Sequence, residues 1–407
     1  MKFIFNSAPK PENVDARQWF DWTWQLRSSL KNSDDFSRYF NLSQEESTAF
    51  LQGAEIFNIR STPYYASLAS KKNPSDPLRR ILLPHSNELS LQRQAQLDPL
   101  GETKKINQPV PRIIHRYSDR VLFLVTDICS VYCRYCTRKH FTGADQAFIK
   151  NSDYEKAIAY IRSKTGLREV ILSGGDPLTV SDVQLERVLT DLRRIEHIEI
   201  IRIGTRIPVV APMRVTDELV RIIKNNKPVF VMTHFNHPRE LTAEAAVALE
   251  KLVDNGIPVM NQMVLLNGVN NHAAIVQALS RRLLYLRVKP YYMFQCDPSP
   301  GTDHLRTSLE DSLQIQKELW GHLSGLAMPN LSVDIPDGGG KALYVPDFEL
   351  SADSERRRYR GWDGVEAEYI NPARSQMMRP SDWGIYSAEW EQLKKSKQSD
   401  AAFELPV

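Results

Sequence analysis

Cysteine is scarce in this chain, because its 407 residues include only four. Three of them, Cys129, Cys133 and Cys136, lie within eight consecutive positions, and the fourth, Cys296, is remote in sequence. Paired cysteines spread through a secreted chain indicate a disulfide framework, and one remote partner for three clustered thiols does not fit that pattern. The cysteine count therefore argues against a disulfide-stabilised protein and directs attention to the cluster of three.

Net charge and long apolar runs are lacking as well. The chain carries 52 basic and 49 acidic residues, a net charge of +3, which gives no bulk electrostatic reason to bind nucleic acid. No apolar stretch approaches the roughly 18 residues of a membrane span. The segment 1–5 is far too short for a signal-peptide core. We therefore predict a cytoplasmic protein that binds neither nucleic acid nor membrane.

The first part of the chain, residues 1–110, is predicted to be a mostly helical N-terminal extension. Residues 15–31 carry Trp, Phe and Leu side chains at approximately helical spacing, which is typical of a helix that packs into a core or an interface. Ser43, followed three residues later by Glu46, predicts a capping box at the start of another helix.

The middle part, residues 111–330, alternates short β-branched runs with helical stretches. The predicted strands are 121–126, 168–173, 198–203, 228–233, 258–264 and 288–293. The predicted helices are 153–164, 182–194, 216–224, 242–254 and 271–285. This alternation indicates parallel βαβ units, and six of them favour an α/β fold with a partial (β/α)6 barrel over a flat sheet. Residues 331–407 then form a C-terminal segment.

Ligand-type residues follow the ends of these predicted strands, where a barrel places its functional loops. Two glycines after the second strand would allow a ligand to approach the backbone, although a tight turn also explains them. Histidines after the fourth strand also suit ordinary hydrogen-bonded loop positions. In chain order these segments are Ser173-Gly174-Gly175-Asp176, Gly204-Thr205-Arg206, His234 to His237, Asn261-Gln262 and Tyr291 to Asp297.

The three cysteines have the spacing C-x3-C-x2-C directly after the first predicted strand. Three thiolates can hold three irons of a [4Fe-4S] cluster and leave the fourth iron open to a small molecule. A structural zinc site would need a fourth ligand, from Cys296 or His140, and buried free cysteines remain a further alternative. The spacing matches the cluster motif of radical S-adenosylmethionine enzymes.

A second chemical element is Lys341, which follows the glycine triplet 338–340. A nucleotide-binding P-loop is rejected, because Ile335 and Ala342 stand where that motif needs Gly and Ser or Thr. A flexible turn with a solvated lysine is one interpretation, and a lysine that forms a Schiff base with pyridoxal phosphate is the other. In the second case Arg116 and Arg120 are candidate partners of the phosphate. Exposed arginines on a connecting segment would give the same sequence pattern.

Together these motifs resemble the lysine 2,3-aminomutase family of radical S-adenosylmethionine, pyridoxal-phosphate enzymes, from about residue 16 to about residue 372. The resemblance rests on the blocks C-S-x-Y-C-R-x-C-T-R, S-G-G-D, T-H-F-N-H-P and D-x-P-x-G-G-G-K in that order. It implies an isomerase that moves the α-amino group of an amino acid to the β-carbon. A non-catalytic metal-binding or interaction protein that kept the fold is the distant alternative.

The resemblance also implies the cofactor sites. Cys129, Cys133 and Cys136 would bind a [4Fe-4S] cluster whose open iron takes S-adenosylmethionine, and Lys341 would carry pyridoxal phosphate. The residues implied near pyridoxal phosphate are Arg116, Tyr117, Arg120 and Gln262. Those implied near adenosylmethionine are Ser173, Gly174, Gly175, Asp176 and His234. A one-electron reductant such as flavodoxin or ferredoxin and a homo-oligomer are the expected partners.

Substrate recognition is implied at three positions. Arg138 matches the arginine that binds the substrate α-carboxylate, and Asp297 and Asp334 match the aspartates that receive the distal ammonium of lysine. A buried cationic terminus needs such carboxylates, whereas a glutamate side chain would need cationic or amide groups there. We therefore expect L-lysine as substrate, with L-arginine as the alternative.

Two departures from the family pattern carry predictions of their own. No cysteine follows Cys296, so the C-terminal cysteine cluster of zinc-containing members is missing and we expect no zinc. Phe294 stands where members of the family can have tyrosine, which removes a hydroxyl beside the substrate pocket.

Overall fold

The computed structural model describes residues 3–53, 58–89, 95–139, 141–143, 147–336 and 339–370, together with three single positions in the C-terminal tail. His140, Asp337, Gly338 and most of the segment 371–407 therefore lie outside the described residues. Among the helices of the described ranges, none is long and apolar enough to cross a membrane.

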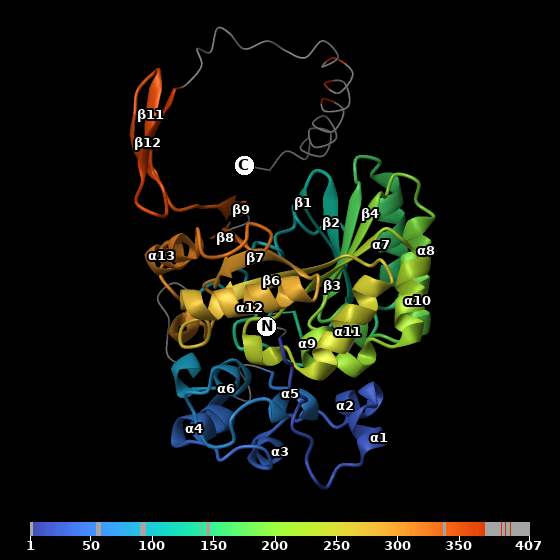
Figure 1. The fold of residues 1–407 in the computed structure, drawn as a ribbon. Helices are drawn as coiled ribbons and strands as arrows, with labels where there is room; N and C mark the ends of the chain where they lie inside the picture. The colour runs from blue at the N-terminus through green and yellow to red at the C-terminus, as the bar shows by residue number, and fades with distance from the viewer. Residues whose placement is uncertain are drawn as a thin grey trace.

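A nine-stranded sheet organises the molecule, with its strands in chain order from β1 to β9 (Figure 1). Its strands are β1 (Ile113–Tyr117), β2 (Arg120–Thr126), β3 (Glu169–Gly174), β4 (Ile200–Gly204), β5 (Val229–Thr233), β6 (Val259–Leu265), β7 (Lys289–Gln295), β8 (Asn330–Ile335) and β9 (Gly340–Leu343). Strands β2 to β8 are parallel to their neighbours, and β1 and β9 are antiparallel edge strands. The two edges approach each other, because the backbone N–H of Lys341 in β9 donates to the hydroxyl of Tyr117 in β1 over 3.3 Å. The sheet is thus a nearly closed barrel.

The prediction of six parallel strands is confirmed, since each predicted range overlaps one of β2 to β7. The structure adds β8 as a seventh parallel strand, which continues the sheet beyond β7. Interior positions such as Phe123, Val125, Leu172 and Ile203 are fully buried, as expected for parallel strands that are covered on both faces.

Helices cover the outer face of the barrel, as Figure 1 shows for α7, α8, α10, α11 and α12. They are α7 (Asn151–Ser163), α8 (Asp182–Arg193), α9 (Ile207–Val210), α10 (Asp217–Asn225), α11 (Ala243–Asp254), α12 (Ala273–Tyr285) and α13 (Leu309–Leu319). The short 3-10 turns are η1 (Ser86–Leu89), η2 (Pro177–Thr179), η3 (Pro212–Arg214), η4 (Pro238–Glu240) and η5 (Asp303–Leu305). Five of the helices match the predicted ranges to within two residues at each end. Helix α8 starts with a capping box between Ser181 and Gln184, which fixes its first turn beside the β3 loop.

The N-terminal lead-in, meaning the described residues before 111, packs below the barrel as a set of short helices (Figure 1). These are α1 (Ala16–Trp19), α2 (Trp22–Arg27), α3 (Ser33–Ser37), α4 (Gln44–Gly53), α5 (Pro63–Ser67) and α6 (Pro77–Leu82). The predicted capping box at α4 is confirmed, because Ser43 and Glu46 each accept the other's backbone N–H. The continuous helix expected over 15–31 is broken at Phe20, because Asp21 accepts the N–H of Thr23 and starts α2 anew.

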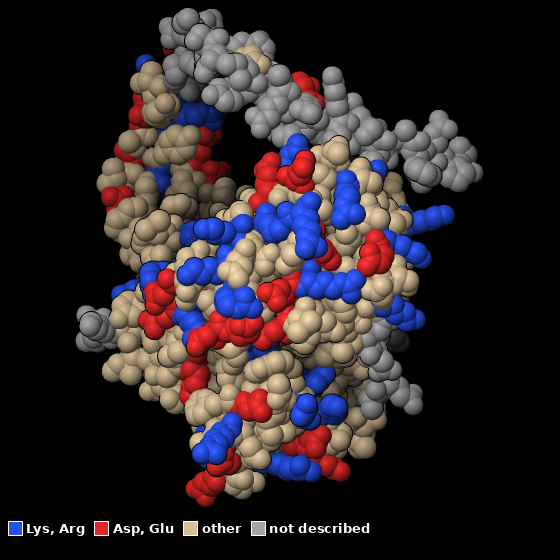
Figure 2. Space-filling model, turned by 90° about the vertical axis from the view of Figure 1, so that its right-hand side faces the viewer, with Lys and Arg blue, Asp and Glu red and all other residues tan. Residues whose placement is uncertain are grey.

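Beyond β9 the chain forms a separate three-stranded antiparallel sheet that projects from the barrel (Figure 1). Its strands are β10 (Glu349–Ala352), β11 (Arg356–Arg360) and β12 (Glu366–Ile370). The basic run 356–360 lies here in β11, where its arginines pair with Glu349, Glu366 and Glu368. Figure 2 shows basic and acidic side chains interspersed on one face of the molecule, in keeping with the low net charge.

Candidate active site

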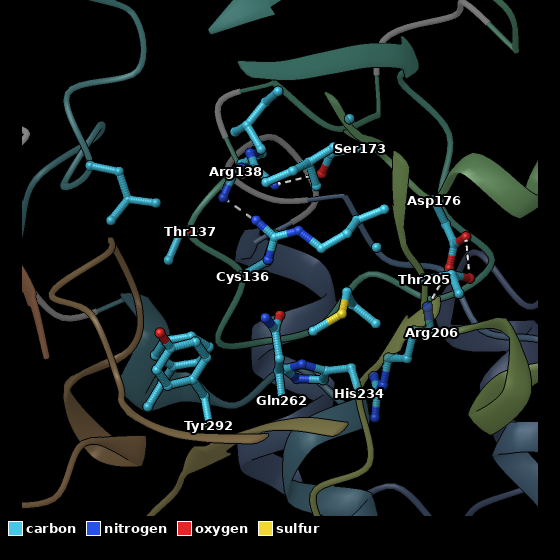
Figure 3. A pocket seen from close by; sticks show the side chains of 18 of the residues that line it. Cys136, Thr137, Arg138, Ser173, Asp176, Thr205, Arg206, His234, Gln262 and Tyr292 are labelled. Carbon is cyan, nitrogen blue, oxygen red and sulfur yellow. Dashed lines mark hydrogen bonds between the residues drawn. The ribbon is translucent and has the colours of Figure 1, made fainter. Parts of the chain in front are cut away.

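One cavity of about 700 Å³ extends through the barrel from the amino ends of β2 to β4 to the loops at the carboxyl ends of the strands, and it is lined by every residue for which the sequence predicts a cofactor or substrate role (Figure 3). Those residues are Arg116, Tyr117, Arg120, Cys129, Cys133, Cys136, Arg138, Ser173, Gly174, Gly175, Asp176, His234, Gln262, Asp297, Asp334 and Lys341. For the cysteine loop and the residues after β3 and β5, the parallel strands explain this convergence, because their carboxyl ends meet at one edge of the barrel; Arg116, Tyr117 and Arg120 instead reach the cavity from the turn at the amino end of β2. Residues more than 200 positions apart in the chain thus come to face one another.

The three cysteines lie on the loop after β2, half-buried and free of disulfides. The lead-in holds this loop, because Tyr132 donates its backbone N–H to Arg60 and the buried Arg134 side chain donates to both oxygens of Glu88. Burial raises the pKa values of the Cys129 and Cys136 thiols. A bound iron would reverse that tendency, since a coordinating metal deprotonates a thiol outright.

The loops after β2 and β3 are joined backbone to backbone. Gly175 donates its N–H to Thr126 over 2.7 Å, and Asp176 donates its N–H to Ile128 over 2.8 Å. A Cβ on Gly174, whose φ is +114°, would lie 2.3 Å from the Thr126 carbonyl oxygen, and one on Gly175 would lie 2.2 Å from that of Ile128. The close contact with the cysteine loop therefore requires glycine at both positions, whether or not a ligand also approaches the backbone there.

The Asp176 carboxylate is buried and already saturated with donors. It accepts from the Leu178 N–H, from the Thr205 hydroxyl over 2.6 Å and from the Arg206 N–H over 2.7 Å. Burial raises its pKa, against the opposing effect of these hydrogen bonds. Figure 3 shows Asp176 turned toward Thr205. Its observed role is to tie the β3 loop to the β4 loop.

Arg138 is held on one side by the lead-in and on the other by β3. Its Nε and Nη2 donate to the two oxygens of Glu102 over 2.8 and 2.7 Å, and its Nη1 donates to Ser173 Oγ over 3.0 Å. A guanidinium has five N–H groups, so one remains on Nη1 and one on Nη2. That edge can take a second carboxylate in bidentate fashion.

Two acids and one lysine also line the cavity. Lys341 Nζ donates to both oxygens of Asp334 over 3.0 and 2.9 Å, and lies 4.8 Å from the Phe294 ring centroid. Asp334 and Lys341 face each other across the β8–β9 pair, which fixes this contact. Burial, and then the charge of Asp334, raises the pKa of Asp297 to about 7.

The antiparallel turn between β1 and β2 contributes two arginines to the cavity, Arg116 and Arg120, which we call the basic wall. Arg116 Nε and Nη2 are buried and have no hydrogen-bond partner in the described structure. The Arg120 guanidinium lies 3.9 Å from the Tyr117 ring centroid and donates to Asp119 over 2.7 Å. Unpartnered buried guanidinium donors beside a cavity are suited to an anionic group such as a phosphate.

His234 lies after β5 and stacks on Tyr135, with ring centroids 5.6 Å apart and its Nε2 2.9 Å from the Tyr135 hydroxyl. Burial, and then the positive charge of Arg206, lowers the pKa of His234 to about 3, so the imidazole is neutral at physiological pH. Gln262 projects from β6 into the same space (Figure 3).

Sequence reasoning assigned no role to three residues that the structure places in the site. Glu102, in the lead-in, carries no recognisable motif, and only the fold brings it to Arg138. Tyr135 occupies the variable position of the cysteine block. Arg206 was predicted to lie in the loop after the third predicted strand. Its contact with the cysteine loop could not be predicted, because the two loops are far apart in sequence.

The fold and the site define a class of protein first. The family model described as "Radical SAM superfamily" matches residues 123–277, which include the end of β2, the cysteine loop and the strands β3 to β6. The chain is therefore a radical S-adenosylmethionine enzyme. Such a protein binds S-adenosylmethionine at a [4Fe-4S] cluster, and three cysteines on a loop that faces the cavity fit this cofactor.

The particular family follows from the remaining comparisons. The model described as "Lysine-2,3-aminomutase" matches residues 316–402. The L-lysine 2,3-aminomutases of Fusobacterium nucleatum and Clostridium subterminale are 43% and 42% identical to this chain; the alignments cover 88% and 89% of the chain, and 84% and 86% of these relatives. A glutamate 2,3-aminomutase of Clostridioides difficile is 38% identical over 86% of this chain and 83% of its own length. The chain belongs to the lysine 2,3-aminomutase family and is an isomerase, consistent with a small-molecule amino acid substrate.

Proposed function

We propose that this enzyme moves the α-amino group of a basic L-amino acid to the β-carbon with the help of pyridoxal phosphate, and that its substrate is L-lysine. The observation that carries the proposal is the shared cavity, which contains the three thiols, the lysine, the basic wall and a separate group for each end of the amino acid. A site that must hold two cofactors and a substrate in contact requires this arrangement.

The residues at the basic wall fit pyridoxal phosphate. Arg116 offers two buried donors without partners, which suit the phosphate, and Tyr117 and Arg120 line the same side. Lys341 Nζ extends from the edge strand β9 and would hold the aldehyde carbon. When bound, the cofactor supplies an imine-forming aldehyde and a conjugated ring that delocalises electrons. The protein supplies orientation and exclusion of water.

The amino acid would lie between Arg138 and the two acids. The free Nη1 and Nη2 edge of Arg138 binds the α-carboxylate, while Glu102 and Ser173 hold the guanidinium in position. Asp297 and Asp334 receive the distal cation, and Asp334 exchanges its pairing with Lys341 for that cation. Two acids in a buried position favour lysine over glutamate as the substrate.

L-Arginine is the second candidate, because the guanidinium of its side chain could also donate hydrogen bonds to the two carboxylates. The product in that case would be β-arginine.

Turnover needs one electron from outside the chain, and we propose a small reductant protein such as a flavodoxin or ferredoxin. We also propose a homo-oligomer in the cytoplasm. We further propose that residues 1–110, 111–330 and 331–407 are folding units, with the last unit adding β8 and β9 to the sheet of the barrel.

The decisive experiment is a substrate comparison under anaerobic conditions. Protein reconstituted with iron, sulfide and pyridoxal phosphate is given adenosylmethionine and a reductant, and L-lysine, L-arginine, L-glutamate and L-alanine are offered separately. We expect β-lysine to form fastest, as measured by chromatography and mass spectrometry of derivatised amino acids. A preference for arginine would overturn the substrate assignment, and the absence of any β-amino acid would overturn the proposed reaction.

A further inference from the structure

Arg206 makes a contact with the cysteine loop that the proposed reaction does not yet use. It follows β4, and its Nη1 donates to Cys133 Sγ over 2.9 Å. The residue is only 8% exposed and lines the cavity beside the three thiols (Figure 3). The Cys133 sulfur stands here for the thiolate that would bind a cluster iron. A cationic donor is thus in direct contact with one of the three cluster ligands.

Arg206 is fixed by groups from three parts of the chain, two of which hold its guanidinium and one its backbone. Its Nη2 donates to the Tyr65 hydroxyl over 2.7 Å and to Glu240 Oε1 over 2.8 Å, and Tyr65 itself donates to Glu240 over 2.7 Å. The backbone N–H of Arg206 is held by Asp176. Tyr65 belongs to α5 of the lead-in and Glu240 to η4, and both are fully buried. The donor to Cys133 is therefore pre-positioned rather than free to turn away.

We propose that Arg206 raises the reduction potential of the cluster. Reduction adds one negative charge, part of which resides on the ligand sulfurs, so a cation that donates to a ligand sulfur stabilises the reduced state more than the oxidised state. Hydrogen bonds to the sulfurs and nearby charge are known determinants of cluster potentials. Glu240 does not cancel the effect, since it pairs with Nη2 whereas Nη1 faces the sulfur.

The expected size follows from the charge-assisted hydrogen bond to the sulfur, because only part of its energy differs between the two redox states. A tenfold change in the ratio of reduced to oxidised cluster equals about 59 mV for a one-electron couple. We expect Arg206→Gln to lower the potential by about this amount, which makes the electron transfer that starts turnover less favourable.

The test is a potentiometric titration of the reconstituted enzyme, followed by the electron paramagnetic resonance signal of the reduced cluster. Arg206→Gln removes the charge at similar side-chain size, and Arg206→Lys keeps the charge without the planar fork. Arg202→Gln is the matched control, because Arg202 lies on β4, pairs with a glutamate (Glu169) and, among the described residues, makes no hydrogen bond with a thiol. Iron and sulfide content confirms that each variant carries its cluster.

We expect the lowest potential for Arg206→Gln, an intermediate value for Arg206→Lys and a smaller shift for Arg202→Gln. An unchanged potential in a fully loaded Arg206→Gln enzyme overturns the inference, as does an equal shift in Arg202→Gln. If Arg206→Gln does not load its cluster, the comparison of Arg206→Lys with Arg202→Gln decides in the same way. The inference rests on the cluster invoked in the proposed function, and failure of the parent enzyme to bind any cluster would instead overturn that function.

Discussion

Asp297 is a residue of the candidate site whose charge state changes near neutral pH. Burial, and then the nearby charge of Asp334, raises its pKa to about 7, so the carboxyl is mostly neutral at pH 6 and mostly ionised at pH 8. A lysine side chain stays cationic over this range and binds the ionised form. We expect the KM for L-lysine to rise as the pH falls below 7, approaching roughly tenfold per pH unit for a single titrating group.

Steady-state kinetics between pH 6 and 8 measure this dependence. The variant Asp297→Asn should bind lysine weakly at every pH and lose the slope in this range. If the KM of the parent enzyme for L-lysine does not change between pH 6 and pH 8, the expectation is contradicted.

Replacement of Lys341 should affect the binding of pyridoxal phosphate and leave the binding of the iron–sulfur cluster unchanged. Because its Nζ is the proposed point of attachment, Lys341→Ala should lose the absorbance band of the bound pyridoxal and lower kcat by roughly 10²-fold or more. The cysteine loop does not depend on this side chain, so iron and sulfide content should stay at the parent level. Absorption spectra and iron analysis of the same preparation check both statements, and a retained pyridoxal band would refute the assignment.

Arg138 illustrates at the residue scale what sequence could and could not predict. The resemblance of the cysteine block to the aminomutase family nominated it, because that block fixes its position two residues after Cys136 on the same loop. The bidentate pairing with Glu102, 36 positions earlier, was not predictable. That contact depends on how the lead-in folds back onto the barrel, and no local pattern encodes it.

At the scale of elements, the loops after β2 and β3 act as one unit. The glycines of the S-G-G-D motif were predicted to admit a ligand, and the structure gives them a second reason, since their backbones contact the cysteine loop directly. Alternating strands and helices were predictable because each type has its own hydrophobic period. The backbone contact between two loops has no such period, and so only the structure reveals it.

We expect Gly175→Ala to separate these two loops. Its Cβ would lie within 2.7 Å of three backbone atoms of Ile128, and backbone cannot move aside as a flexible side chain does. The cost should be about 1–3 kcal/mol of stability, as for overpacking in a core, with a lower iron content.

Thermal unfolding under anaerobic conditions and iron analysis measure both effects of Gly175→Ala. Gly325→Ala is the control, because its added Cβ meets no atom within 4 Å. Equal behaviour of the two variants would show that the loop contact is unimportant.

At the scale of the whole molecule, the lead-in is a part of the active site. Tyr65 reaches Arg206, Glu102 reaches Arg138, and Glu88 forms a buried ion pair with Arg134 inside the cysteine block. The lead-in thus braces the cysteine loop from the side opposite the barrel strands. The aromatic residues of its helices predicted packing but not the surface against which they pack.

The buried pair gives a test at this scale. Removing one partner leaves the other charge buried without compensation, so Glu88→Gln should cost roughly 3–5 kcal/mol and reduce retention of iron. Glu218→Gln removes a carboxylate from an exposed pair with Arg221, three residues away on α10, and should cost less than about 0.5 kcal/mol. Melting temperatures and iron content of the two variants, prepared side by side, should differ accordingly. A Glu88→Gln enzyme as stable as Glu218→Gln would refute the bracing role.

The sequence by itself determined the strand and helix order and the cysteine loop, because local spacing and hydrophobic period specify these features, and the family resemblance of its motifs nominated the acids, arginines and lysine of the candidate site. Only the tertiary structure decided that β8 extends the barrel, that β1 and β9 bring Tyr117 to Lys341, and that the lead-in supplies Glu102 and Tyr65 to the site. Contacts between distant segments depend on the packing of the whole chain. Their partners share no local pattern from which they could be predicted.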